Sequence, residues 1–205
     1  MPTNPTPFRV AIVPGVNPGK WTRAWADRRR TPIEVTPIGQ ADQLAALTEG
    51  RADVAFVRLP IDRANLNVIR LYEEVAVVVV PREHPISLYD SVTTADLAGE
   101  TIRQEPVDAA IDLVVAGAGI MLLPQSIARQ HTRRDLEVRP VTDAPVTEVA
   151  IAWLAEETTP DVEEFVGIVR GRTAASSRGA SGEPQEAAPR KSAQQKPVQT
   201  PRRGR

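Results

Sequence analysis

Short apolar runs of strand length alternate with stretches in which apolar residues recur at helical spacing, from about residue 8 to residue 170. An apolar run bounded by turn residues is typical of a strand covered on both faces of its sheet. Because strands and helices alternate, the pattern predicts an α/β fold with mixed, mostly parallel sheets. The strands predicted from these runs are 9–13, 33–38, 54–58, 75–80, 119–124, 136–141 and 146–154.

Capping residues indicate where the helices begin and end. Asn17 suits an N-cap and Pro18 suits the first helical position, so a helix is expected to start there. A second helix is predicted over 42–49, ended by Gly50 in the C′ position. The other helices are predicted over 107–116, after Pro124 and after Thr159-Pro160.

Composition restricts the chemistry that this chain can perform. Only 4% of the 205 residues are aromatic, so an aliphatic core is expected. The absence of Cys excludes disulfides, thiolate nucleophiles and Cys-based metal sites. His84 and His131 lie far apart and share no metal-ligand spacing. Without a convergent set of nucleophile, base or metal ligands, we expect no enzyme activity, no catalytic residues, no bound metal and no cofactor.

Neither a targeting segment nor a membrane span is evident in the sequence. The residues before Phe8 include no positively charged region and no apolar stretch of the kind found in secretory signals. Apolar runs such as 75–80 have strand length, whereas a membrane span needs about 20 residues. The sequence therefore predicts a soluble cytoplasmic protein without membrane contact.

Charge is divided unevenly between the body and the C-terminal end. From Arg170 onward there are nine Lys/Arg and two Glu, a net charge of +7, whereas the preceding residues carry 16 Lys/Arg and 24 Asp/Glu, a net charge of −8. Because residues 171–205 contain little that could form a core, we expect a disordered basic tail, and likewise a disordered N-terminus over 1–7. The tail could make weak, sequence-independent contact with nucleic acid, or it could be a solubilising extension, and we favour the second interpretation.

Two motifs carry a resemblance to a known family. The first is Leu44-Ala-Ala-Leu47-Thr-Glu-Gly50-Arg-Ala-Asp53 followed by an apolar strand, and the second is Gly117-Ala-Gly119-Ile-Met-Leu-Leu-Pro124. Their order and spacing resemble the effector-binding domain of LysR-type transcriptional regulators. The resemblance implies a type II periplasmic-binding-protein fold: a first lobe of about 8–83 and 144–170, and a second lobe of about 84–143. Two crossover strands would join the lobes, and a small ligand would bind between them.

The chain departs from the pattern of that family in three places. Family members begin with a helix-turn-helix module, and nothing before Phe8 could fold into one. The second lobe is shortened, because Gln104-Glu-Pro106 stands where the family has several tens of residues. The loops Pro14-Gly15-Val16 and Gly39-Gln40-Ala41 lack the hydroxyl side chains that usually bind a ligand in the family.

The resemblance places Asn17, Gln40 and Arg58 at the ligand cleft. Asn17 could instead cap its helix, which is the preferred interpretation, and for Gln40 capping and ligand contact are equally plausible. The planar guanidinium of Arg58 suits a carboxylate, but a surface ion pair with Asp62 is at least as plausible. Glu73 and Glu74 fall in what reads as a charged connector, where adjacent carboxylates are usually solvated.

These observations favour a stand-alone LysR-like effector-binding domain as the function, a module that senses a small carboxylate or aromatic acid or interacts with proteins. The resemblance implies a homodimer, or a heterodimer with LysR-type regulators, formed through the first helix. Trp21 and Trp25 on this helix could anchor that interface or belong to the core. The chain would have no specific DNA binding of its own. The alternative is a cytoplasmic small-solute-binding protein of the same fold without a role in transcription.

Overall fold

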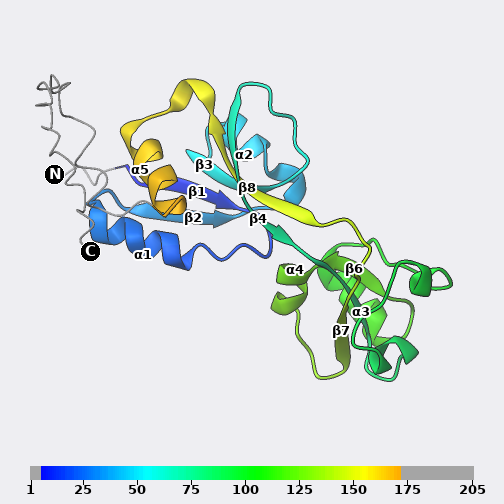
Figure 1. The fold of residues 1–205 in the computed structure, drawn as a ribbon. Helices are drawn as coiled ribbons and strands as arrows, with labels where there is room; N and C mark the ends of the chain where they lie inside the picture. Colours follow the sequence, from blue (N-terminus) through cyan, green and yellow to red (C-terminus); the bar gives the residue numbers. More distant parts are fainter. Residues whose placement is uncertain (1–5, 172–205) are drawn as a thin grey trace, which may run out of the picture. The chain divides into compact units, whose positions relative to one another are not determined.

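The fold, a computed structural model, is described for residues 6–171 and contains two sheets, each with its own helices (Figure 1). The five-stranded sheet has the strand order β2-β1-β3-β8-β4 and belongs to the first lobe. Its elements are β1 (Phe8–Ile12), α1 (Gly19–Arg28), β2 (Ile33–Pro37), η1 (Gln40–Asp42), α2 (Ala45–Thr48), β3 (Val54–Arg58), β4 (Leu66–Glu74), β8 (Thr147–Leu154), η4 (Ala155–Glu157) and α5 (Pro160–Val169).

The second lobe contains a three-stranded sheet with the order β6-β5-β7. Its elements are β5 (Ala76–Pro81), η2 (Pro85–Leu88), η3 (Ala95–Leu97), α3 (Val107–Val115), β6 (Met121–Pro124), α4 (Gln125–Gln130) and β7 (Leu136–Pro140). The α/β class and the mixed sheets are thus confirmed. The boundary predicted after residue 83 is wrong, because β5 pairs with β6 and β7 rather than with the first sheet. An apolar run looks the same in either sheet, so its pairing could not be read from the run itself.

The sequence predicted that most strands would be parallel, and this part of the prediction is wrong. β1 pairs in parallel with β2 and β3, whereas the other four pairs of named strands are antiparallel. The reason lies in the crossovers: β4 leads from the first lobe into the second, and β8 returns from it and runs antiparallel to both β3 and β4.

Local signals account for several helix ends. The Thr159 hydroxyl accepts a hydrogen bond from the Val162 amide at 3.3 Å, and Pro160 occupies the first position of α5. Gly50 follows α2 with φ of +64°, the left-handed conformation that favours glycine after a helix. The predicted helix over 42–49 is in fact a 3-10 turn followed by the short α2.

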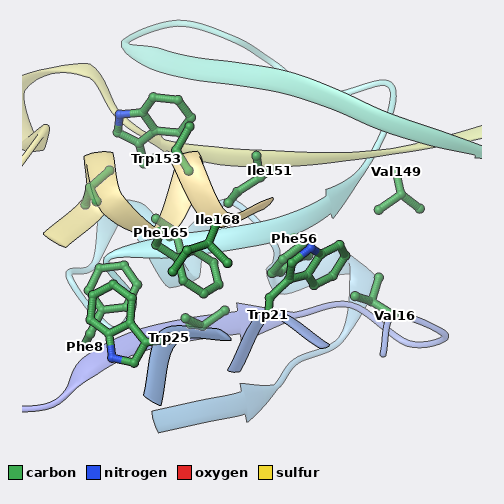
Figure 2. Close-up of a cluster of buried hydrophobic side chains, with 14 of the residues drawn as sticks. Phe8, Val16, Trp21, Trp25, Phe56, Val149, Ile151, Trp153, Phe165 and Ile168 are labelled. Atoms are coloured by element: carbon green, nitrogen blue, oxygen red, sulfur yellow. The ribbon is translucent and has the colours of Figure 1, made fainter. Parts of the chain in front are cut away.

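Figure 2 shows that the few aromatic residues are concentrated in one core cluster. All three Phe and all three Trp of the chain belong to it, between the five-stranded sheet and the helices α1 and α5. Trp25 stacks on Phe8 and Trp21 stacks on Phe56, each at 4.6 Å between ring centroids. The aliphatic core expected from composition is therefore wrong for this side of the sheet. The other face of the sheet is aliphatic, with Leu47, Val57 and small alanines.

The same contacts decide the role of Trp21 and Trp25. Their exposed fractions are 6% and 0%, and the Trp25 indole donates to the Thr31 carbonyl at 2.7 Å. Both side chains are thus part of the protomer core, and the interpretation of these residues as interface anchors is wrong. Trp21 and Trp25 bury their rings against the five-stranded sheet and so are not available to a partner chain.

The strand β4 was not predicted from the sequence. Its polar positions, which include Asn67, Arg70 and Glu73, hide the pattern, because β4 lies at the edge of the sheet and pairs only with β8. The pairing shifts by one residue between Arg70 and Tyr72, which is a β-bulge. A bulge changes which side chains face the interior after it. Glu74 is buried as a result, so its interpretation as a solvated connector charge is wrong.

The predictions of a disordered N-terminus and of a disordered basic tail concern mainly residues 1–5 and 172–205. These lie outside the described residues, and so does any contact of the tail with nucleic acid.

Candidate functional site

A buried ion pair lies where the first lobe passes into the second. Arg58 is the last residue of β3, and Glu74 is the last residue of β4 before the crossover to β5. The Glu74 Oε2 atom accepts from Arg58 Nε at 3.0 Å and from Nη2 at 2.7 Å. The exposed fractions of the two side chains are 2% and 4%. The surface pair with Asp62 that the sequence allowed is therefore wrong.

Arg58 is also bonded to two other segments of the first lobe. Its Nη2 donates to the Pro14 carbonyl at 3.0 Å, directly before Gly15 in the loop after β1. Its backbone amide donates to Gln43 Oε1 at 2.8 Å, and its carbonyl accepts from Gln43 Nε2 at 3.1 Å. In the part of the chain that the structure describes, Arg58 Nη1 and Glu74 Oε1 are buried without a hydrogen-bond partner. Such atoms are unusual in native proteins and mark a place where a further polar group would be stabilised.

Gly15 brings the first lobe into contact with the second. Its amide donates to Gln130 Oε1 on α4 at 3.1 Å. Its φ is +89°, and a Cβ at this position would overlap the Ser126 hydroxyl. Only glycine therefore permits both the backbone conformation and the close approach of α4. The loop that the sequence showed to lack a hydroxyl thus lies against a hydroxyl from the other lobe.

A pocket of about 390 Å³ opens at the start of α1. We call it the α1 pocket, lined by Gly15, Asn17, Lys20, Trp21, Arg23 and Tyr72. Its two cations are not in any of the ion pairs formed among residues 6–171. The Lys20 ammonium lies 4.5 Å from the centre of the Trp21 ring, and Arg23 Nε donates to the Gly19 carbonyl at 3.1 Å. The pocket therefore offers positive charge beside aromatic surface, a combination that suits a small organic anion.

Tyr72 connects the α1 pocket with the ion pair. Burial raises the pKa of its phenol, the Glu74 carboxylate raises this pKa further, and Arg58 lowers it. Tyr72 thus responds to both members of the ion pair and also lines the pocket. Since it precedes Glu74 by two residues on β4, a ligand that contacts Tyr72 would lie close to the crossover between the lobes.

The three predicted site residues lie in different environments. The Asn17 Oδ1 accepts from the Gly19 amide at 3.0 Å, but the N-cap of α1 is Pro18, so the prediction of Asn17 as the N-cap is wrong by one residue. The Asn17 side chain also lines the α1 pocket. Gln40 is exposed and does not line this pocket. Arg58 is buried beneath the loop rather than open at the cleft mouth. Of the three, only Asn17 lies in the pocket itself.

Sequence reasoning missed Gln43, Glu74 and Tyr72, and it passed over Lys20 and Arg23. The last two had a signal, because cations three residues apart at the start of a helix lie on one face. Glu74 had none, since its burial depends on the bulge in β4.

Residues 6–171 contain neither a cluster of metal ligands nor a membrane-spanning helix. No group of three or more His, Asp or Glu side chains is placed to hold a metal ion there. No helix in this range is long and apolar enough to cross a membrane.

Comparison with known proteins now decides the family. The model of the LysR substrate binding domain matches residues 26–106 and 101–174. The chain belongs to this family. Its fold agrees, since the effector binding domain of a BenM variant superposes with a TM-score of 0.69 at 24% identity, covering 83% of this chain and 95% of that one. The BenM effector binding domain with its effector benzoate gives a TM-score of 0.66 at 23% identity, covering 86% and 95%.

Curated relatives of this LysR-family chain are transcription regulators. The HTH-type transcriptional regulator CatR from Pseudomonas putida is 27% identical over 158 residues, which cover 62% of this chain and 54% of CatR. The Hca operon transcriptional activator HcaR from Escherichia coli (strain K12) is 24% identical over 175 residues, covering 70% and 59%. The chain thus spans about half the length of the curated relatives it matches.

Proposed function

We propose that this LysR-type effector-binding domain senses a small carboxylate or aromatic acid that binds in the α1 pocket. The observation that carries the proposal is the pairing of two cations, Lys20 and Arg23, with the rings of Trp21 and Tyr72 around one pocket. A carboxylate gains from charge-assisted hydrogen bonds to Lys and Arg, while an aromatic body gains from the ring surface. The benzoate effector of BenM belongs to this chemical class.

Arg58 acts in this proposal from beneath the site. Its guanidinium links the Pro14 carbonyl, at the loop that borders the pocket, with Glu74 at the crossover. A ligand that moves the Pro14-Gly15 loop would therefore disturb a pair bonded to the crossover strand. Glycine at position 15 and the Gln130 bond extend the same path to α4 of the second lobe. In this way binding at α1 would change the contact between the lobes.

We propose further that the output is transcription control in the cytoplasm, through association with LysR-type regulators as a homodimer or heterodimer. Similarity to CatR and HcaR supports this output over the alternative of a solute-binding protein without a regulatory role. Because Trp21 and Trp25 are buried in the core, the contact would be made by other surfaces of the domain. Co-expression with a LysR-type regulator, followed by pull-down, tests the association. A chain that never co-purifies would contradict it.

Thermal unfolding against a panel of small carboxylates and aromatic acids, with benzoate included, tests the sensing function. A ligand that binds only the native state raises the melting temperature by an amount that grows with the ratio of its concentration to its Kd. We expect at least one acid to raise it, and the Lys20→Gln/Arg23→Gln variant to lose most of the shift. The Arg63→Gln/Arg134→Gln variant, which removes two exposed cations that do not line the pocket, is the charge-matched control and should keep the shift. Loss of the shift in the control alone, or equal shifts in all variants, would contradict binding in the α1 pocket.

A further inference from the structure

A second pocket, of about 260 Å³, lies within the second lobe between α4 and the three-stranded sheet. We call it the α4 pocket. Its floor is aliphatic, with Val77 from β5, Val138 and Pro140 from β7, and Ala128 from α4. Val77, Val138 and Ala128 also belong to the hydrophobic cluster on this side of the sheet. An apolar body placed on this floor would therefore continue the core of the lobe.

No carboxylate lines the α4 pocket. Side chains alternate between the two faces of a strand, so Val138 and Pro140 face the pocket while Glu137 and Arg139 face away. The latter two pair with each other at 3.0 Å. The floor is thus free of negative charge.

Two polar side chains, the cation of Arg129 and the amide of Gln125, line the rim of the pocket. Gln125 and Arg129 lie four residues apart on α4 and hence on the same helix face. Within residues 6–171, neither side chain has a hydrogen-bond or ion-pair partner. Arg133, four residues further along the chain and beyond the end of α4, differs because Asp112 at 3.0 Å and Asp135 at 3.3 Å bind its guanidinium. Arg129 is therefore the cation left available at this pocket.

We propose that the α4 pocket is a second ligand site, for a small monocarboxylate with a compact aliphatic body. The guanidinium fork of Arg129 and the Gln125 amide would bind the carboxylate, and the aliphatic floor would take the body. Its volume is just below the roughly 300–1,000 Å³ of pockets for drug-sized ligands, which limits the occupant to a small molecule. The site is separate from the α1 pocket, because α4 turns a different face, Ser126 and Gln130, toward Gly15.

Cyclohexanecarboxylate is the probe, and cyclohexanecarboxamide is its uncharged match. Each is titrated into the 205-residue chain with labelled valine methyl groups, and the methyl shifts of Val77 and Val138 are followed by NMR. We expect the methyl signals of Val77 and Val138 to shift with cyclohexanecarboxylate and to shift far less with cyclohexanecarboxamide. Loss of the charge-assisted bonds of the guanidinium in Arg129→Gln should weaken binding of the acid at least about tenfold. The exposed Arg134→Gln variant, which does not line the pocket, should bind as the wild type does.

Three results would overturn the site: no shift at Val77 and Val138, equal shifts with the amide, or an affinity that Arg129→Gln leaves unchanged. Arg129 is exposed, so its substitution should not impair folding. The Lys20→Gln/Arg23→Gln variant separates this site from the sensing function. It should leave the Val77 and Val138 shifts intact whether or not the α1 pocket binds an acid, and their loss would contradict an independent site.

Discussion

Arg58 and Glu74 form a buried ion pair between the ends of two strands, with Nη2 2.7 Å from Oε2 and both side chains almost inaccessible to solvent. β3 and β4 are not neighbours in the sheet, because β8 lies between them. The pair therefore reaches across the returning crossover strand at the junction of the two lobes. Buried charge at this junction is the feature around which the proposed sensing mechanism is built.

Removing one partner of this pair should be strongly destabilising, since it leaves the other charge buried without compensation. We expect Glu74→Ala to lower the free energy of unfolding by about 3–5 kcal/mol, measured by denaturant titration. The matched control is Arg70→Ala, which breaks the Arg70–Glu148 pair at an Arg side chain that is 65% exposed. It should cost no more than about 1 kcal/mol. Equal losses in the two variants would contradict a special role of the buried pair.

Gly15→Ala should disturb the contact between the lobes as well as the backbone. The new Cβ would overlap the Ser126 hydroxyl, and φ of +89° is strained for any other residue. We expect a loss of about 2–4 kcal/mol in unfolding free energy, the sum of backbone strain and overpacking. Gly50→Ala is the control, because it has φ of +64° but no atom within 4 Å of the added Cβ.

Comparing Gly15→Ala with Gly50→Ala separates the cost of backbone strain from the cost of overlap with Ser126. Gly50→Ala should cost only about 1 kcal/mol, the strain alone. Ser126→Gly should restore part of the stability of Gly15→Ala and none of that of Gly50→Ala. An additive double variant would show that the two side chains do not meet.

Trp25→Ala should lower the free energy of unfolding by about 3–5 kcal/mol, because it empties a fully buried aromatic position. Since the residue packs within its own protomer, the loss should be the same at every protein concentration. Unfolding of the variant and the wild type over a hundredfold concentration range measures this. A loss that shrinks as the protein is concentrated would instead place Trp25 in a dimer interface.

Hydrogen bonds from Thr94 should make folding sensitive to acid. The Thr94 hydroxyl donates to Asp143 Oδ2 at 2.7 Å and its amide donates to Oδ1 at 2.6 Å, and the hydroxyl is the main cause of the lowered pKa of Asp143. A carboxyl whose pKa is lower in the folded state stabilises the fold above its ordinary pKa. This contribution is lost as the pH falls through the folded value.

Thr94→Val removes the hydroxyl bond, so the Asp143 pKa should rise toward its ordinary value. The stability of the variant should accordingly fall less steeply below about pH 4 than that of the wild type. Carboxyl carbon shifts in an NMR titration measure the pKa directly. Thr48→Val is the control, because that hydroxyl donates to the Leu44 carbonyl and not to a carboxylate. An unchanged Asp143 titration in Thr94→Val would contradict this account.

Much of the fold could be predicted because its signals are local. Thr159-Pro160 marks the start of α5, Gly50 marks the end of α2, and the apolar runs mark the buried strands. What failed depended on pairing between distant segments. β5 has the composition of any buried strand, and only its partners β6 and β7 assign it to the second lobe.

The candidate site was harder to predict for the same reason. Asn17 could be found because the resemblance places it in the loop before the first helix, which borders the α1 pocket. Arg58 was identified, but its partner Glu74 lies 16 residues away, beyond a bulge that no residue pattern announces. Gln43, which is bonded to both the amide and the carbonyl of Arg58, looks like any polar residue at the start of a helix.

A crystal structure of the chain with benzoate, or with whichever acid gives the largest thermal shift, tests the central claim most directly. The account predicts the carboxylate within hydrogen-bond distance of Lys20 or Arg23 and the body of the acid against Trp21 or Tyr72. An acid bound only elsewhere, against Arg129 for example, with the α1 pocket unchanged, would contradict it.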